Sequence, residues 1–258
     1  MNFIKITNNS KLINNASGLG IKFLVDLERG SKLKRQENTT AWLSNHTINE
    51  YLKLKKEFPN ELIGVRINRF SENVFEDLMT IKHSNPSFVM LPMWTTLEEV
   101  GQFKSIFYDC TNLILLAETK ESLKIILNGH IHDRIFDVHF GLNDLRIEYK
   151  YKSIFEILAS KILESPCKEL QLKGINYGIG GVGSFSNSKN LLIDPADLLT
   201  IYKFLGAKTT ILSQSFDNTH NIRQSILQII DYTNSVEKIS QIQYNSIIKK
   251  INEAIAIC

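Results

Sequence analysis

Two acidic residues, Glu118 and Asp144, stand where apolar runs of the chain end. Glu118 closes the run that begins at Asn112, and Asp144 comes just after the run that begins at Ile135. Such runs predict buried parallel strands, whose carboxyl ends form the edge where α/β proteins bind ligands. Two carboxylates there suit Mg²⁺, with Mn²⁺ as an alternative, because Mg²⁺ needs few protein ligands and takes water and substrate oxygens as the rest.

Polar side chains also end two earlier apolar runs. Asp26 and Glu28 close one run, and Arg66 and Asn68 close the next. A charge inside an apolar strand is costly unless it is paired or bound to a ligand. Arg66 has an apolar residue on either side, so it points to the opposite face of the strand, where it could hold a substrate carboxylate in a bidentate fork. A buried ion pair of Arg66 with Glu28 or Asp26 explains the same pattern equally well.

The elements that must position these residues alternate along nearly the whole chain. Apolar runs predict eight strands, at Phe3–Ile6, Lys22–Leu27, Leu62–Asn68, Phe88–Pro92, Leu113–Ala117, Arg134–Phe140, Glu169–Lys173 and Thr209–Gln214. Between them, apolar residues within 97–107 share one helical face. Asp194 followed by Pro195 predicts the start of a helix over 196–205, and Gly206 predicts its end.

This alternation favours a (β/α)8 TIM barrel of the α/β class. An open doubly wound sheet is the alternative, and the barrel is preferred because the number of strands and the chain length both fit it. We expect one TIM-barrel domain over residues 1–258. Isoleucines alternate with polar residues in 215–258, which predicts extra C-terminal helices that pack on the barrel or on a partner subunit.

The composition excludes several classes of protein. The 258 residues are 43% hydrophobic and 22% charged with a net charge of +3, which is ordinary for a soluble globular protein and does not indicate nucleic-acid binding. No apolar run is long enough for a membrane span, and the first residues lack a signal-peptide pattern. The cysteines, Cys110, Cys167 and Cys258, are too far apart for a zinc site and suit a reducing compartment. We therefore expect a cytoplasmic protein without nucleic-acid or membrane partners.

Several short motifs, in order along nearly the whole chain, resemble those of one enzyme superfamily. This is the HpcH/HpaI aldolase and citrate lyase β-subunit superfamily, in its citrate lyase β-like branch. Each motif alone is weak, and their order and spacing together carry the resemblance. The matching segments are Asn8-Asn-Ser-Lys-Leu-Ile, Gly20-Ile-Lys-Phe-Leu-Val-Asp-Leu-Glu28, Val65-Arg-Ile-Asn68, Val89-Met-Leu-Pro92, Leu116-Ala-Glu-Thr119 and Phe140-Gly-Leu-Asn-Asp-Leu145.

The resemblance implies a TIM barrel that cleaves or forms a carbon–carbon bond beside a carbonyl. In the superfamily, the residues that match Glu118 and Asp144 bind Mg²⁺, which stabilises an enolate as a Lewis acid. The residue that matches Arg66 binds the carboxylate or keto group of the substrate. We assign catalysis to Arg66, Asp26 and Glu28, with the two acids supporting metal-bound water or moving a proton. Substrate binding is assigned to Arg66, Asn68 and Gly141.

The chain departs from the superfamily pattern at three places. Arg29 stands where an acid follows the "DLE" segment, Met93 replaces the lysine of "LPK", and Ser213 lies where "IHP" is usual. Some of these positions help to hold coenzyme A in the superfamily, so the departures favour a small 2-keto or β-hydroxy acid as the substrate, with an acyl-CoA as the alternative. The same departures leave open a second possibility, a catalytically altered barrel that serves as a binding or assembly subunit. In either case we expect a homo-oligomer.

Two further features each allow two interpretations from the sequence. The segment 174–187 holds five glycines, and we expect an active-site loop or lid there, with an anion-binding nest of backbone N–H groups as the alternative. His139 lies inside the sixth predicted strand, where a histidine with satisfied hydrogen bonds in the core is the usual case.

Overall fold

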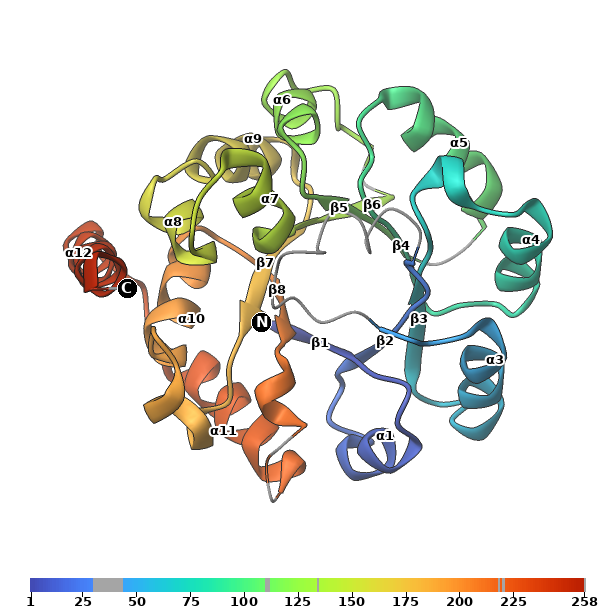
Figure 1. Cartoon of the computed structure of the whole chain (residues 1–258), viewed down its shortest axis with the longest axis horizontal. Coiled ribbons are helices and arrows are strands. Elements are labelled where there is room, and N and C mark those ends of the chain that lie inside the picture. Colours follow the sequence, from blue (N-terminus) through green and yellow to red (C-terminus); the bar gives the residue numbers. More distant parts are fainter. Residues whose placement is uncertain (30–43, 110–111, 134, 218, 220, 258) are drawn as a thin grey trace.

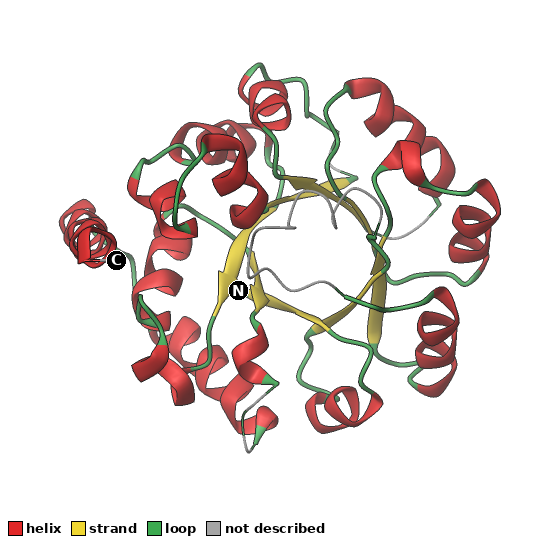
Figure 2. Cartoon of the chain, in the orientation of Figure 1, coloured by secondary structure: helices red, strands yellow, loops and turns green. Residues whose placement is uncertain are grey.

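The computed structural model of the protein describes residues 1–29, 44–109, 112–133, 135–217, 219 and 221–257. The expectations for Cys110 and Cys258, and for a strand beginning at Arg134, fall outside these residues. In the described part of the chain, eight parallel strands close into a barrel in sequence order (Figures 1 and 2). They are β1 (Asn2–Ile6), β2 (Lys22–Asp26), β3 (Leu62–Arg66), β4 (Val89–Leu91), β5 (Leu113–Ala117), β6 (Phe136–Phe140), β7 (Tyr177–Val182) and β8 (Thr209–Leu212).

Helices surround the barrel on its outer side (Figure 2). Side-chain caps set the starts of many of them. Thr47, Thr96 and Ser153 each form a reciprocal capping box with the glutamate three residues later. The α-helices are α1 (Ser10–Ala16), α3 (Ile48–Glu57), α4 (Phe75–His83), α5 (Leu97–Phe107), α6 (Lys120–Leu127), α7 (Leu142–Tyr149), α8 (Ile154–Ala159), α9 (Glu164–Lys173), α10 (Pro195–Phe204), α11 (Ile222–Ser235) and α12 (Gln241–Ile257). The 3₁₀ helices are η1 (Phe70–Glu72), η2 (Phe185–Asn190) and η3 (Gln214–Phe216).

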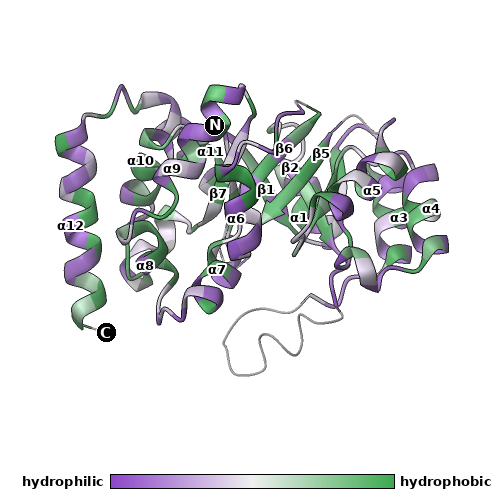
Figure 3. Ribbon diagram, turned by 90° about the horizontal axis from the view of Figure 1, so that it is seen from above, coloured by the Kyte–Doolittle hydropathy of each residue, from purple (hydrophilic) through white to green (hydrophobic). Residues whose placement is uncertain are grey.

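The alternation of side chains along the strands divides the apolar core into two parts. One large cluster lies between the strands and the surrounding helices. A smaller cluster fills the inside of the barrel, which is why the strands appear hydrophobic in Figure 3. Its buried members are Ile4, Leu24, Phe88, Met90, Ile114 and Leu116. The TIM-barrel prediction is therefore confirmed, and the interior of the barrel is packed rather than open.

The prediction for the seventh strand was wrong. Glu169–Lys173 forms the last part of α9, and the strand is Tyr177–Val182, inside the glycine-rich segment that we expected to be a loop. Leu170 and Leu172 alternate as in a strand, but Leu170 is buried and Leu172 is 72% exposed, so they lie on different sides of a helix. A strand rich in glycine has little of the side-chain pattern by which strands are recognised.

The C-terminal tail forms two amphipathic helices beyond the barrel strands. α11 lies against α1, and α12 lies against α8 and α10, at one edge of the molecule (Figures 1 and 3). α12 buries one face, on which Tyr244 stacks on Phe204 of α10 with 4.2 Å between ring centres and donates a hydrogen bond to Glu164. None of the described helices combines the length and apolarity of a membrane span.

The packing inside the barrel leaves no space for a side chain at Gly64 on β3, which can be tested by substitution. A Cβ at this position would lie 2.4 Å from the backbone oxygen of Phe88 and 2.6 Å from its ring. We expect Gly64→Ala to lower the free energy of unfolding by roughly 1–3 kcal/mol, as overpacking of a core does. Denaturant unfolding followed by circular dichroism measures this change.

A matched control is Gly101→Ala in the middle of α5, where a Cβ would meet nothing within 4 Å. Alanine there should raise the stability by roughly 0.5–1 kcal/mol, because glycine is a poor helix former. Equal effects of the two substitutions would contradict the packing described for β3 and β4.

Candidate active site

A cavity of about 870 Å³ lies at the carboxyl ends of the strands. Glu118, Asp144, Arg66 and Gly141 all line it, so the structure brings together four of the residues predicted from sequence. The remaining wall comes from the ends of β1, β5, β6, β7 and β8, from α7, from the segment between α7 and α8, and from Leu191. The residues among these that matter below are Lys5, His139, Asn143, Arg146, Lys152 and Ser213.

Glu118 directly follows β5 and is held in one position. Its side chain is buried, and Oε1 accepts a hydrogen bond of 3.0 Å from the backbone N–H of Met93. Met93 has a φ of 51°, a left-handed conformation that is uncommon for residues other than glycine. The next residue after Glu118, Thr119, donates from Oγ1 to the backbone oxygen of Trp94. Two hydrogen bonds thus hold the chain after β4 against the end of β5, and the turn at Met93 directs its backbone N–H toward the Glu118 carboxylate.

Gly141 explains how Glu118 and Asp144 come to share one wall. Gly141 is the N-cap of α7, and a Cβ there would lie 2.7 Å from Oε2 of Glu118. Only glycine allows this approach. Asp144 lies in the first turn of α7 and is 9% exposed. The positive end of the helix dipole favours its negative charge.

Arg66 makes the buried ion pair that was one of the two sequence interpretations. Its Nε and Nη2 donate to Asp26 at 2.8 and 2.6 Å, and Nε lies 3.4 Å from Oε2 of Glu28. Burial opposes the charged form, but the charges of Asp26 and Glu28 outweigh it and raise the pKa of Arg66. The guanidinium is therefore a permanent cation in the cavity wall, and Nη1 has no acceptor among the described residues.

Asp26, Glu28 and Asn68 lie outside the described lining of the cavity. Asp26 and Glu28 are buried beside Arg66 and orient it. Asn68 accepts a hydrogen bond of 2.8 Å from the backbone N–H of Arg29 and lines a separate, smaller hollow of about 240 Å³. Asp26 and Glu28 therefore act on the cavity through Arg66, whereas Asn68 bonds to the chain that follows β2.

His139 on β6 lies in the cavity wall, although the sequence predicted only a core histidine with satisfied hydrogen bonds. Its ring is 1% exposed, and its Nδ1 would lie 2.4 Å from a Cβ at Gly178, so the glycine of β7 makes room for it. Nε2 has no hydrogen-bond partner among the described residues, so the histidine is not fully satisfied. Burial, together with the charge of Arg66, outweighs a hydrogen bond with the Gly180 backbone and lowers the pKa of His139 to about 4.

Lys5 on β1 is a second residue that sequence reasoning missed. It lies between two isoleucines, is 1% exposed and lines the cavity. Its ammonium forms an ion pair of 2.8 Å with Asp217 and donates to the backbone oxygen of Ser213. Burial lowers the pKa of Lys5 although Asp217 raises it. A charge inside an apolar strand, the signal that selected Arg66, applies equally to Lys5.

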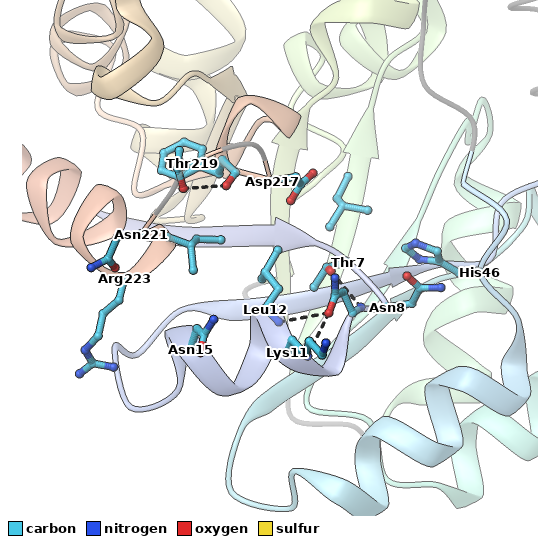
Figure 4. A pocket seen from close by; sticks show the side chains of 14 residues that line it. Thr7, Asn8, Lys11, Leu12, Asn15, His46, Asp217, Thr219, Asn221 and Arg223 are labelled. Carbon is cyan, nitrogen blue, oxygen red and sulfur yellow. Dashed lines mark hydrogen bonds between the residues drawn. The ribbon is translucent and has the colours of Figure 1, made fainter.

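A second cavity of about 610 Å³ lies beside the first, between α1 and the segment that precedes α11 (Figure 4). Amide and hydroxyl side chains are the most frequent kind in its lining, and Ile6 borders both cavities. Many of these groups already serve local structure. Asn9 caps α1, Asn221 caps α11, and Asp217 holds Lys5. None of the site residues predicted from sequence lines this cavity.

The donor set of the first cavity fits a hard divalent cation. Within the described ranges no three His, Cys, Asp or Glu side chains gather as a closed metal site. Glu118 and Asp144 instead supply two carboxylates to an open cavity, which is how Mg²⁺ is held when water and substrate complete its shell. The missing side chain of Gly141 keeps this corner accessible beside Glu118.

Comparisons with known proteins show the fold. No protein-family model and no curated protein matches the chain. The citrate lyase β subunit of Mycobacterium tuberculosis, solved with oxaloacetate and magnesium, matches with a TM-score of 0.61 at 14% identity, over 87% of this chain and 95% of that one. An HpcH/HpaI aldolase from Desulfitobacterium hafniense matches with a TM-score of 0.59 at 11% identity, over 92% and 94%. The chain therefore shares its fold with structures of the superfamily that its motifs resemble.

The lowered pKa of His139 predicts a pH dependence of stability. An unfolded histidine takes up a proton below about pH 6.5, whereas the folded protein resists this until about pH 4. Stability is therefore lost as the pH falls through this window, by about 3 kcal/mol at most from this group. In His139→Leu, which cannot titrate, the loss between pH 7 and pH 4.5 should be about 2 kcal/mol smaller than in the wild type.

Urea unfolding at the two pH values measures the effect. The control is His83→Leu, which removes an exposed histidine from α4 and should keep the steep wild-type fall. The same fall in His139→Leu as in the wild type would show that His139 is not held neutral.

Proposed function

We propose that the protein is a Mg²⁺-dependent carbon–carbon lyase or aldolase that acts on a 2-keto or β-hydroxy acid. The observation that carries this proposal is the meeting of Glu118, Asp144 and the permanent cation Arg66 in one cavity at the carboxyl ends of the strands. Mn²⁺ would serve in the same place. The oxaloacetate and magnesium in the related citrate lyase β structure support both the metal and the class of substrate.

Each residue has a role that follows from its contacts. Glu118 and Asp144 would hold the cation, which supplies Lewis-acid stabilisation of the negative charge that develops when a bond beside a carbonyl breaks. Arg66 would orient the carboxylate of the substrate. Its charge needs no rearrangement during the reaction, because Asp26 and Glu28 already fix the guanidinium. We assign Asp26 and Glu28 to this positioning, since they touch Arg66 and not the cavity.

The geometry favours a small acid over an acyl-CoA. Met93 stands where the superfamily has lysine, and it meets Glu118 through its backbone N–H. Asn68 accepts from the backbone N–H of Arg29, and the Arg29 guanidinium donates to the backbone oxygens of Asn45 and His46, so both side chains are engaged outside the cavity lining. A cavity of about 870 Å³ accommodates a short keto or hydroxy acid with its water.

A second candidate, a barrel that has lost catalysis and serves as a binding or assembly subunit, is favoured by the departures at Arg29, Met93 and Ser213. Release of pyruvate or acetyl-CoA in the presence of Mg²⁺ or Mn²⁺ distinguishes the two. Clear turnover of any keto or hydroxy acid would eliminate the second candidate. A homo-oligomer remains our proposal for the assembly, and light scattering in solution tests it.

The metal assignment predicts the behaviour of two conservative substitutions. Glu118→Gln and Asp144→Asn each remove one negative oxygen donor, so each should weaken Mg²⁺ binding by tenfold or more, about 1.4 kcal/mol, in isothermal titration calorimetry. Glu121→Gln, an exposed acid in the first turn of α6, is the control and should bind as the wild type does. Unchanged affinity in both site variants would refute the metal assignment.

Gly141→Ala tests the same site without removing a ligand. The backbone φ of −86° accepts alanine, but the new Cβ would lie 2.7 Å from Oε2 of Glu118 and must displace it. We expect the variant to fold and to lose most of its Mg²⁺ affinity. Wild-type affinity in a folded Gly141→Ala would mean that the position of the Glu118 carboxylate is not needed for the metal.

A further inference from the structure

The charged side chains that line the first cavity differ in how they are neutralised. Arg66 is paired with Asp26 and Glu28, and Lys5 is paired with Asp217. Two cations remain in the lining, Arg146 of α7 and Lys152 in the segment before α8. Neither has a carboxylate within ion-pair distance among the described residues. The cavity lining thus contains positive charge that no carboxylate of the described residues neutralises.

Arg146 is the better ordered of these two cations. It is partly buried, whereas Lys152 is exposed. Nη1 of Arg146 donates to the backbone oxygen of Lys152 at 3.3 Å, and Nη2 lies 3.5 Å from Oδ1 of Asn143. Both acceptors are neutral, so they orient the guanidinium without cancelling its charge. An oriented guanidinium with free donor capacity is suited to a carboxylate or a phosphate.

The place of Arg146 relative to the proposed metal defines the ligand. Asp144 and Arg146 lie on the same helix, two residues apart, so their side chains leave the helix in different directions. Both line the cavity, so a ligand that extends from Asp144 across the cavity can meet Arg146 at its other end. One carboxylate of the substrate is already assigned to Arg66 and the metal. Arg146 is therefore available for a different anionic group.

We propose that Arg146 binds a second anionic group, a carboxylate or a phosphate, at the end of the substrate that is distant from the metal. The substrate is then a dianionic keto or hydroxy acid, and Arg146 selects it against monoanionic acids such as pyruvate. This inference rests on the proposed function, because it takes the metal-bound end of the substrate as given.

Equilibrium binding of three probes in saturating Mg²⁺ tests the inference on the full chain. The probes are pyruvate, which has no second anion, 2-oxoglutarate, which has a distal carboxylate, and phosphonopyruvate, which has a distal phosphonate. The wild type should bind at least one dianionic probe roughly tenfold or more tighter than pyruvate, as a hydrogen bond to a charged group implies. Which dianion is preferred distinguishes the carboxylate from the phosphate.

Arg146→Gln should abolish this preference and leave the pyruvate affinity within about twofold, and Arg146→Lys should restore part of it. Arg223→Gln is the matched control, because Arg223 donates to a backbone oxygen, that of Ser17, and lines the second cavity. It should keep the wild-type preference. Thermal unfolding of each variant confirms that it is folded.

The outcomes separate this inference from the proposed function. Binding of pyruvate without any preference for a dianion, or a preference that survives in Arg146→Gln, overturns the inference alone. Failure of all three probes to bind in the presence of Mg²⁺ overturns the proposed function, and the inference with it.

Discussion

The arrangement of the barrel mouth depends on the cost of burying charge. Lys5, Asp26, Glu28, Arg66 and Glu118 are all at most 8% exposed, and a buried charge without a partner costs several kcal/mol. Each of them therefore has to meet another group of the protein. Arg66 joins β3 to β2 through Asp26, Lys5 joins β1 to the chain after β8 through Asp217, and Glu118 joins β5 to the turn after β4. The same contacts that satisfy the charges also set the shape of the cavity.

The arrangement of the barrel mouth also requires glycine at two positions, where a side chain would collide with a neighbouring group. Gly141 gives the Glu118 carboxylate its place, and Gly178 gives His139 its place inside the barrel. In both cases a side chain would occupy space that a functional group from the neighbouring strand already fills. The glycine-rich β7 is thus a barrel strand that lacks a side chain at Gly178, and the His139 ring occupies the space that a side chain there would fill. A loop at this point, as the composition suggested, would leave that ring without a wall.

The structure also separates residues that hold the site from residues that can touch a ligand. Asp26, Glu28 and Asn68 were all assigned contact with substrate or its reaction, but none of them belongs to the described cavity lining. Asp26 and Glu28 pair with Arg66, and Asn68 accepts from the backbone N–H of Arg29. Glu118, Asp144 and Arg66 remain on the wall, and Lys5, His139 and Arg146 join them. The electrostatic character of the cavity follows from this division, since protein carboxylates fix the charges of Arg66 and Lys5, whereas Arg146 meets only neutral acceptors among the described residues.

The amino-acid sequence by itself determined the alternation of strands and helices, the closed α/β class, the amphipathic tail and the position of two acids at strand ends. These depend on local periodicity and on residues close together in the chain, which a pattern can detect. Only the tertiary structure decided which strand the glycines form, that both Asp26 and Glu28 pair with Arg66, and that Lys5 meets Asp217. These features depend on contacts between residues far apart in the chain. Burial and steric fit decide there between pairings and strand assignments that the sequence pattern alone does not distinguish. Glu118 depends on both kinds of information. Its place at a strand end follows from the local sequence, and its orientation follows from tertiary contacts with Met93 and Gly141.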